Sequence, residues 1–496
     1  MLNRSIVLML VAACLLVCWP ANLAFAQGTG SPPNIIVVLA DDLGWGDLTC
    51  YNADSRVSTP NLDRLAKDGI RFTDAHSPSA VCTPTRYGLL TGRYCWRSRL
   101  KRGVLGGNSK LLIEQGRATV ASMLQEAGYH TACIGKWHLG LQTGPGKVDW
   151  QQPMRPGPVT VGFDYFYGIP ASLDMAPYVW VENDRLVAQP TERVPASGHR
   201  REGGGGFWRG GAIAPGFKHA DVQPTLIEKS VQYINQRNGQ VPDQPFFLYL
   251  PLASPHTPWV PSEPFMGRTG VDAPGGYYTD FVAEIDWGIG QLIHALEAGG
   301  ELDNTLIIVT SDNGSHWLAA DIERHGHHAN GPWRGQKADI YEGGHRVPFV
   351  LHWPAGAKAG AVCDQPVCHV DLFATFASIA GKPLEADQAE DSFDLTPLLN
   401  EPGLQNPIRA SMVLHALNGT FAIRVGQWKL IPDNLGSGGF TRPSNQEPET
   451  DQPNGQLYNL AEDPGETSNL YTQHPERVEQ MRALLEAQQE AGRTRP

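Results

Sequence analysis

The sequence predicts an α/β protein with a large mixed, mostly parallel sheet that is sandwiched by helices. Short, β-rich apolar runs alternate along the chain with stretches of helical pattern, which is typical of parallel strands joined by crossover helices. Polar side chains follow directly after several of these runs, and open α/β sheets bind ligands beside the carboxyl ends of their strands. We therefore expect the functional residues at those strand ends.

Individual elements follow from this pattern. The predicted strands are 34–40, 130–135, 245–253, 305–311 and 348–353, and the predicted helices are 59–69, 118–128, 221–238, 278–300 and 371–381. After about residue 395 the pattern changes to antiparallel-like pieces and a final helix from 475 to about 491. We predict a main domain over 27–395, a smaller C-terminal α+β subdomain with a small antiparallel sheet over 396–496, and loops at 197–211 and 433–456.

Residues 1–26 have the pattern of a secretory signal peptide. Arg4 precedes an apolar run over 6–19, and small residues at Ala24 and Ala26 suit peptidase cleavage. The run is shorter than the ~20 residues that span a bilayer, which disfavours the alternative of a retained anchor helix. Lipid attachment at Cys14 is a second alternative. We predict an exported protein, periplasmic or extracellular, with no membrane span after signal removal.

Charge and cysteine content exclude some classes of protein. The net charge of −12 argues against a nucleic-acid partner, because phosphate contacts need a basic face. Positive charge for an anionic ligand would have to be local. The few cysteines that remain after signal removal do not make a disulfide scaffold, although Cys363 and Cys368 are close enough in sequence to pair.

Two pairs of oxygen-bearing side chains follow predicted strands. Asp41 and Asp42 come directly after 34–40, and Asp312 and Asn313 come directly after 305–311. Adjacent parallel strands would bring all four to one edge of the sheet. Oxygen-only ligands suit Ca²⁺ or Mg²⁺, whereas zinc prefers histidine or thiolate. The alternative is that these residues cap helices or turns.

Basic side chains follow other strands. Lys136 and His138 come after 130–135, His256 comes after 245–253, and Lys337 lies in another polar segment. Each alone has an ordinary explanation as a solvated lysine or a hydrogen-bonded histidine. Together with Arg86 they predict a pocket for a small oxyanion, with histidines for proton transfer.

Cys82 begins a short predicted helix in "CTPTR", with Pro84 in the first helical turn. The helix dipole would point its positive end at the oxyanion pocket, so an activated thiolate of a cysteine hydrolase is one interpretation. Thiolate is, however, a soft ligand beside a hard-oxygen site, and no histidine lies near it in sequence.

The stretch "CTPTRYGLLTGR" resembles the signature of the formylglycine-dependent (type I) sulfatases, an arylsulfatase-like family of the alkaline-phosphatase superfamily. "GKWHLG" (135–140) is similar to their second signature, and the order of "ADD", "PHTPW", "SDNG" and "GGHRVPFV" also matches. The resemblance covers nearly the whole mature chain. It implies an alkaline-phosphatase-like fold and hydrolysis of sulfuric esters.

The resemblance also implies that a maturation enzyme oxidises Cys82 to formylglycine, whose hydrate carries two hydroxyls. One Ca²⁺ ion is then held by Asp41, Asp42, Asp312, Asn313 and the modified Cys82. The implied catalytic residues are Cys82, Arg86 steadying the hydrate, Lys136, His256 and Lys337 around the sulfate ester, and His138 facing the second hydroxyl. Ser172 matches a substrate-side position of the family, and His316, just past "SDNGS", is a further candidate substrate contact.

The substrate is expected to be a sulfated small molecule or, more specifically, a sulfated saccharide. Aromatic residues with arginines suit such ligands, and one region offers Trp180, Arg200, Arg201, Trp208 and Arg209. One alternative is a phosphomonoesterase or phosphonate hydrolase of the same fold, which would use threonine or serine and two zinc ions. The other is a non-catalytic carbohydrate-binding protein.

Overall fold

The computed structural model describes residues 32–198, 207–241, 243–448 and 453–495. The predicted signal peptide with Cys14, and the candidate residues Arg200 and Arg201, lie outside these ranges.

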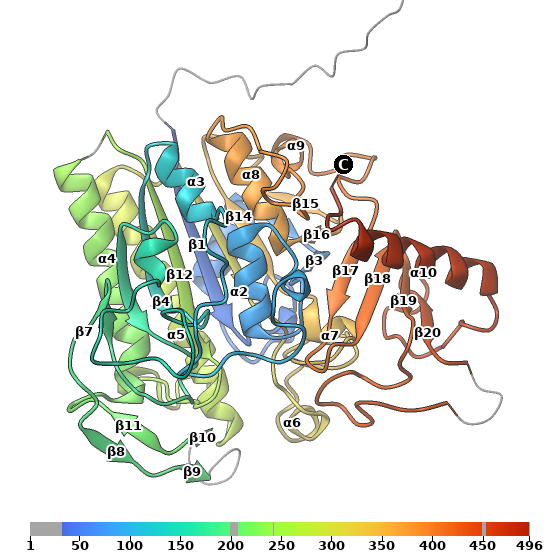
Figure 1. Cartoon of the computed structure of the whole chain (residues 1–496), viewed down its shortest axis with the longest axis horizontal. Coiled ribbons are helices and arrows are strands. Elements are labelled where there is room, and N and C mark those ends of the chain that lie inside the picture. Colours follow the sequence, from blue (N-terminus) through green and yellow to red (C-terminus); the bar gives the residue numbers. More distant parts are fainter. Residues whose placement is uncertain (1–31, 199–206, 242, 449–452, 496) are drawn as a thin grey trace, which may run out of the picture. The chain divides into compact units, whose positions relative to one another are not determined.

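A ten-stranded sheet forms the centre of the fold (Figure 1), and it contains all five predicted strands. Its order is β15 (Ala361–Cys363), β2 (Ile70–Phe72), β14 (Phe349–His352), β13 (Thr305–Ser311), β1 (Asn34–Asp41), β12 (Phe246–Pro255), β4 (His130–Lys136), β5 (Tyr165–Ile169), β6 (Val181–Glu182) and β7 (Arg185–Leu186). Strands β13, β1, β12, β4 and β5 are parallel, whereas β14 runs antiparallel to both neighbours. The prediction of a mixed, mostly parallel sheet is confirmed.

Every residue of β1, β12 and β13 is buried, because helices cover both faces of this sheet. In one group, α1 (Pro60–Asp68) and α4 (Val222–Gln240) pack on α5 (Gly275–Gly299). In the other, α2 (Cys82–Thr91), α3 (Val120–Glu126) and α8 (Leu372–Ile379) pack together. The five predicted helices are all present. Shorter helices are α6 (Ala319–His325), α7 (Glu342–His345) and α9 (Thr396–Asn400).

The C-terminal part is an antiparallel sheet with a helix packed on it, as predicted. Its strands are β17 (Met412–His415), β18 (Phe421–Val425), β19 (Trp428–Ile431) and β20 (Gln456–Asn459), and α10 (Pro475–Glu490) contacts β18 and β19. The hydrophobic core of this part also contains Tyr94, Trp96, Ile340 and Tyr341 from the main part. The boundary at residue 395 stays a prediction.

The structure differs from two further local predictions. The expected loop at 197–211 contains, in its described residues, short strands: β9 (Ser197–Gly198) pairs with β10 (Phe207–Trp208), and β11 (Gly211–Ile213) pairs with β8 (Glu192–Val194). Cys363 and Cys368 are free, buried thiols. They are close in sequence but join different sheets, since Cys363 pairs with β2 whereas Cys368, in β16 (Val367–Cys368), pairs with β3 (Ala75–His76).

In the described ranges, each helix is too short or too polar to cross a bilayer.

Candidate functional site

The register of two parallel strands brings the predicted oxygen ligands together. Ala40 on β1 is opposite Ser311 on β13, so the residues that follow both strands meet at one edge of the sheet. The amide of Asn313 donates to Asp42 Oδ1 at 2.7 Å, and the backbone N–H of Asp42 donates to Asp312 Oδ1 at 3.3 Å. Asp41, Asp42, Asp312 and Asn313 are all buried.

This cluster fits a hard divalent cation. Oδ1 of Asp41 and Oδ1 of Asn313 are buried and have no hydrogen-bond donor among the described residues. Side chains of Asp41, Asp312 and Cys82 place ligand atoms within 4.8 Å of one another. Buried oxygens without donors cost stability, and oxygen is the ligand that Ca²⁺ and Mg²⁺ prefer. Burial, together with the charge of Asp41, raises the pKa of Asp312 above its usual range.

Cys82 is the first residue of α2, and its side chain is buried beside His138. Its Sγ lies 3.3 Å from His138 Nδ1, while His138 Nε2 lies 2.7 Å from the carbonyl oxygen of Leu105. Because a carbonyl only accepts, Nε2 carries the hydrogen and Nδ1 is free to take a proton from a group at position 82. Burial and the nearby charge of Lys136 hold the pKa of His138 well below its usual range, so the ring is neutral.

The thiol itself is not activated. Burial raises the pKa of Cys82 to about 11, despite the charge of Lys136. At neutral pH the group is therefore a protonated thiol, which argues against the cysteine-hydrolase interpretation.

Arg86 lies one helical turn after Cys82, and its guanidinium binds residues at the ends of two strands. Its Nε and Nη2 donate to Asp312 Oδ2 at 3.1 and 2.8 Å, and Nη1 donates to the carbonyl of Lys136 at 2.7 Å. The guanidinium thus links α2 to the ends of β13 and β4. It does not line the pocket described below.

The basic residues expected around an oxyanion converge on the same carboxylates. Lys136 Nζ binds Asp41 and donates to Ser172 Oγ at 3.2 Å. Lys337 Nζ lies 2.7 and 2.8 Å from the two carboxylate oxygens of Asp42. Burial would lower the pKa of Lys337, but the Asp42 carboxylate raises it above its usual range, so the ammonium stays charged.

His256 stands between these groups. Its Nε2 lies 3.8 Å from Asp42 Oδ2, and its Nδ1 lies 3.4 Å from Ser172 Oγ and 2.5 Å from the carbonyl oxygen of Thr257. A proton on Nδ1 is therefore donated to the carbonyl, and Nε2 is the nitrogen available for proton exchange. Burial and the charge of Lys337 lower the pKa of His256, which makes its protonated form a stronger acid.

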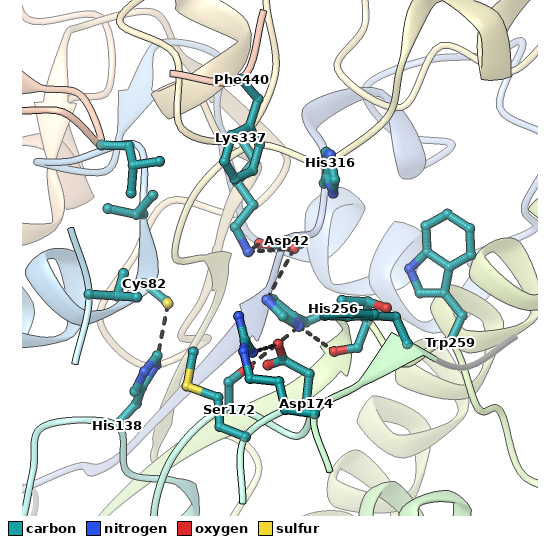
Figure 2. A pocket seen from close by; sticks show the side chains of 17 residues that line it. Asp42, Cys82, His138, Ser172, Asp174, His256, Trp259, His316, Lys337 and Phe440 are labelled. Atoms are coloured by element: carbon teal, nitrogen blue, oxygen red, sulfur yellow. Dashed lines mark hydrogen bonds and ion pairs between the residues drawn. The ribbon is translucent and has the colours of Figure 1, made fainter. Parts of the chain in front are cut away.

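A cavity of about 170 Å³ opens above these side chains (Figure 2). Of the residues predicted from sequence, it is lined by Asp42, Cys82, His138, Ser172, Arg209, His256, His316 and Lys337. Trp180 and Trp208 do not line it; Trp208 stacks on His219 and Trp180 on Tyr167.

Sequence reasoning missed several lining residues, among them Asp174, Trp259 and Phe440. Asp174 is two positions after Ser172, and this spacing was the only local signal. Phe440 comes from the long 433–456 segment of the C-terminal part, far from the other lining residues in sequence.

These contacts define a class of protein, a hydrolase of anionic esters with a place for one divalent cation. The family model described as Sulfatase matches residues 33–382, and the chain belongs to the sulfatase family. It is 37% identical over 494 residues to the N-acetylgalactosamine-6-O-sulfatase of Bacteroides thetaiotaomicron, with 92% of this chain and 93% of the relative covered. It is 35% identical over 481 residues to human arylsulfatase A, covering 92% of this chain and 86% of the relative.

A solved structure from a study of glycosaminoglycan metabolism by Bacteroides thetaiotaomicron has the same fold, with a TM-score of 0.81 at 35% identity, covering 93% of this chain and 100% of that chain. The protein is therefore a sulfuric ester hydrolase with a sulfatase fold, as the resemblance implied. The named relatives favour this activity over the phosphomonoesterase alternative and over non-catalytic binding.

Proposed function

We propose that this enzyme removes sulfate from a sulfated carbohydrate, with formylglycine made from Cys82 and one Ca²⁺ ion. The observation that carries the proposal is the position of Cys82 at the start of α2, where its Sγ lies 3.3 Å from His138 Nδ1 and within 4.8 Å of carboxylate oxygens of Asp41 and Asp312. The names of relatives that act on sulfated sugars support the substrate class.

Asp41, Asp42, Asp312 and Asn313, with the modified residue 82, would hold the ion. When bound, Ca²⁺ supplies positive charge against the sulfate oxygens, and a formylglycine hydrate supplies one hydroxyl to attack sulfur and a second whose deprotonation releases sulfate.

The remaining side chains orient the ester and move protons. Lys136 and Lys337 place two ammonium groups beside the sulfate, where charge builds up during sulfuryl transfer. In its protonated form, the His256 ring gives a proton from Nε2 to the sugar oxygen as the bond from that oxygen to sulfur breaks. His138 Nδ1 takes the proton from the second hydroxyl at position 82, and its Nε2–H stays on the Leu105 carbonyl.

The proposal has two cellular requirements. A formylglycine-generating enzyme must act on Cys82, because the encoded thiol lacks the second hydroxyl. Export through residues 1–26 would place the enzyme in the periplasm or outside the cell, where sulfated polysaccharides are found.

The test is to produce the chain with and without a maturation enzyme. In active material the peptide with Cys82 should be lighter by about 18 Da, the difference between CH₂SH and CHO, and sulfate release from N-acetylgalactosamine 6-sulfate should rise with the converted fraction. The peptide with Cys95, a buried cysteine outside the motif, should keep its mass. Undiminished sulfate release by material that holds only the thiol would overturn the formylglycine mechanism.

A further inference from the structure

An ion pair in the pocket has no part in the chemistry above. Asp174 follows β5 and binds Arg209 Nη1 through its Oδ2. The Asp174 side chain is 4% exposed, and its Oδ1 is buried without a hydrogen-bond partner in the described part of the chain. Both residues line the same cavity as Cys82 and His256, and Asp174 lies beside His256 in Figure 2.

Hydrogen bonds to main-chain carbonyls connect the two residues of this ion pair. The backbone N–H of Arg209 donates to the carbonyl of Asp174 at 3.0 Å, and the Tyr178 hydroxyl lies 3.0 Å from the Asp174 carbonyl and 2.6 Å from that of Arg209. These bonds hold the backbones of the two residues together, and the ion pair with Arg209 orients the buried Asp174 carboxylate, so less entropy is lost when a ligand binds.

One oxygen of the Asp174 carboxylate is thus buried without a hydrogen-bond donor, and the Ser172 hydroxyl is the other polar group beside this carboxylate. Leaving such an acceptor unpaired costs free energy, and a ligand hydroxyl that donates to it would recover that cost. Arg209 is 52% exposed, so its remaining N–H groups can donate to the same ligand. A carboxylate acceptor beside guanidinium donors matches a sugar hydroxyl, which both donates and accepts.

We propose that Asp174 and Arg209 bind ring hydroxyls of the sugar that carries the sulfate, and so determine which sulfated sugars are hydrolysed. The inference rests on the proposed function. His256 must reach the oxygen that links sulfur to the sugar, and Asp174 lies beside His256, so the hydroxyls nearest the sulfated carbon face the pair. Its Oδ1 accepts from one hydroxyl while Arg209 donates to that hydroxyl or its neighbour.

The test combines a substitution in the enzyme with the removal of one hydroxyl from the substrate. The matured enzyme and Asp174→Asn are each given N-acetylgalactosamine 6-sulfate and its 3-deoxy and 4-deoxy analogues, and kcat/KM is measured. A lost hydrogen bond to a charged group should cost the wild type roughly 10- to 100-fold for at least one analogue. The same deletion should cost Asp174→Asn several-fold less than it costs the wild type, because the amide oxygen can still accept a hydrogen bond but no longer carries the charge.

Asp184→Asn is the matched control. Asp184 forms a similar ion pair with Arg155, but neither residue lines the cavity, so this variant should show the wild-type penalty. If Asp174→Asn does not fold, Arg209→Gln serves in its place, since a half-exposed side chain can be replaced without disturbing the core.

The outcomes separate the two proposals. Absence of sulfate release by the fully converted wild type would overturn the proposed function and this inference together. Sulfate release with a deoxy penalty that is unchanged in the variants, or with no penalty for either analogue, would overturn only the role of Asp174 and Arg209.

Discussion

Asp312 has several contacts at the centre of the site. One carboxylate accepts from the backbone of Asp42 and from two nitrogens of Arg86, and it also faces the proposed cation. Its raised pKa reflects burial next to Asp41. A bound cation would favour its charged form and oppose that shift.

We predict that Asp312→Asn weakens Ca²⁺ binding by at least about 10-fold, because one anionic ligand becomes a neutral amide of the same shape. Bound calcium is measured by elemental analysis after dialysis, and folding by thermal unfolding. Asp286→Asn is the control, since Asp286 is also buried but caps α1 through the N–H groups of Asn61 and Leu62. Equal calcium retention by both variants would remove Asp312 from the metal site.

At the level of residues, the sequence predicted those contacts that follow from the register of neighbouring strands. Asp41 and Asp312 had to meet if their strands were adjacent and parallel, and they do. The contact of Cys82 with His138, 56 positions apart, could only be inferred from family resemblance. Asp174 was missed because a single carboxylate in a loop has no pattern that separates a ligand contact from a turn.

Among the elements, α5 stabilises the segment that carries His256. Glu284 in the middle of this 25-residue helix accepts from the backbone N–H and the hydroxyl of Ser262, at 3.0 and 2.7 Å. Burial raises the pKa of Glu284 to about 7, from 4.5. The folded state therefore binds this proton more tightly than the unfolded state, and the resulting stabilisation is complete below about pH 4.5 and is lost as pH rises toward 7.

We predict that Glu284→Gln removes this dependence. Between pH 5 and pH 8 the free energy of unfolding of the variant should rise relative to wild type by about 2.5 kcal/mol, because glutamine does not ionise. The measurement is urea unfolding of both proteins at several pH values. Glu297→Gln on the exposed side of α5 is the control for the same substitution in the same helix. A parallel profile for Glu284→Gln would show that Glu284 keeps its ordinary pKa.

Long elements were predictable, and short ones were not. The buried strands and long helices have strong apolar patterns, whereas β2, β6 and β7 have two or three residues each and form only because a neighbour offers hydrogen bonds. The antiparallel direction of β14 was equally hidden, because an apolar run of four residues reads the same in either direction.

In the whole molecule, the C-terminal part supports the segment around Lys337. Leu417 N–H donates to the carbonyl of Ala338 at 3.0 Å, and Ile340 N–H donates to that of Ser437 at 2.7 Å. The Thr441 hydroxyl binds Asp339, also at hydrogen-bond distance. The sequence predicted this part as a smaller C-terminal subdomain packed on the main one, since its change of pattern is visible. Individual contacts between residues far apart in the sequence leave no local signal.

We predict that a chain ending at residue 395 fails to form a stable, calcium-binding fold. Truncation would expose Tyr94, Trp96, Ile340 and Tyr341 to water and would release the Lys337 segment. Circular dichroism, thermal unfolding and calcium content are compared with the chain 27–496 prepared in the same way. Cooperative unfolding with normal calcium content in the short chain would instead establish 27–395 as an independent domain.

The burial of Cys82 has a consequence for the order of events after synthesis. Only 3% of this residue is exposed, and positions 82–91 are coiled into α2 with Arg86 bound to Asp312. The proposed maturation enzyme would therefore have to bind this stretch before the chain has folded. Under the proposed function, conversion would have to precede folding, and a molecule that folds first would keep its thiol for as long as it stays folded. The yield of active enzyme would then depend on how slowly the newly synthesised chain folds and buries Cys82.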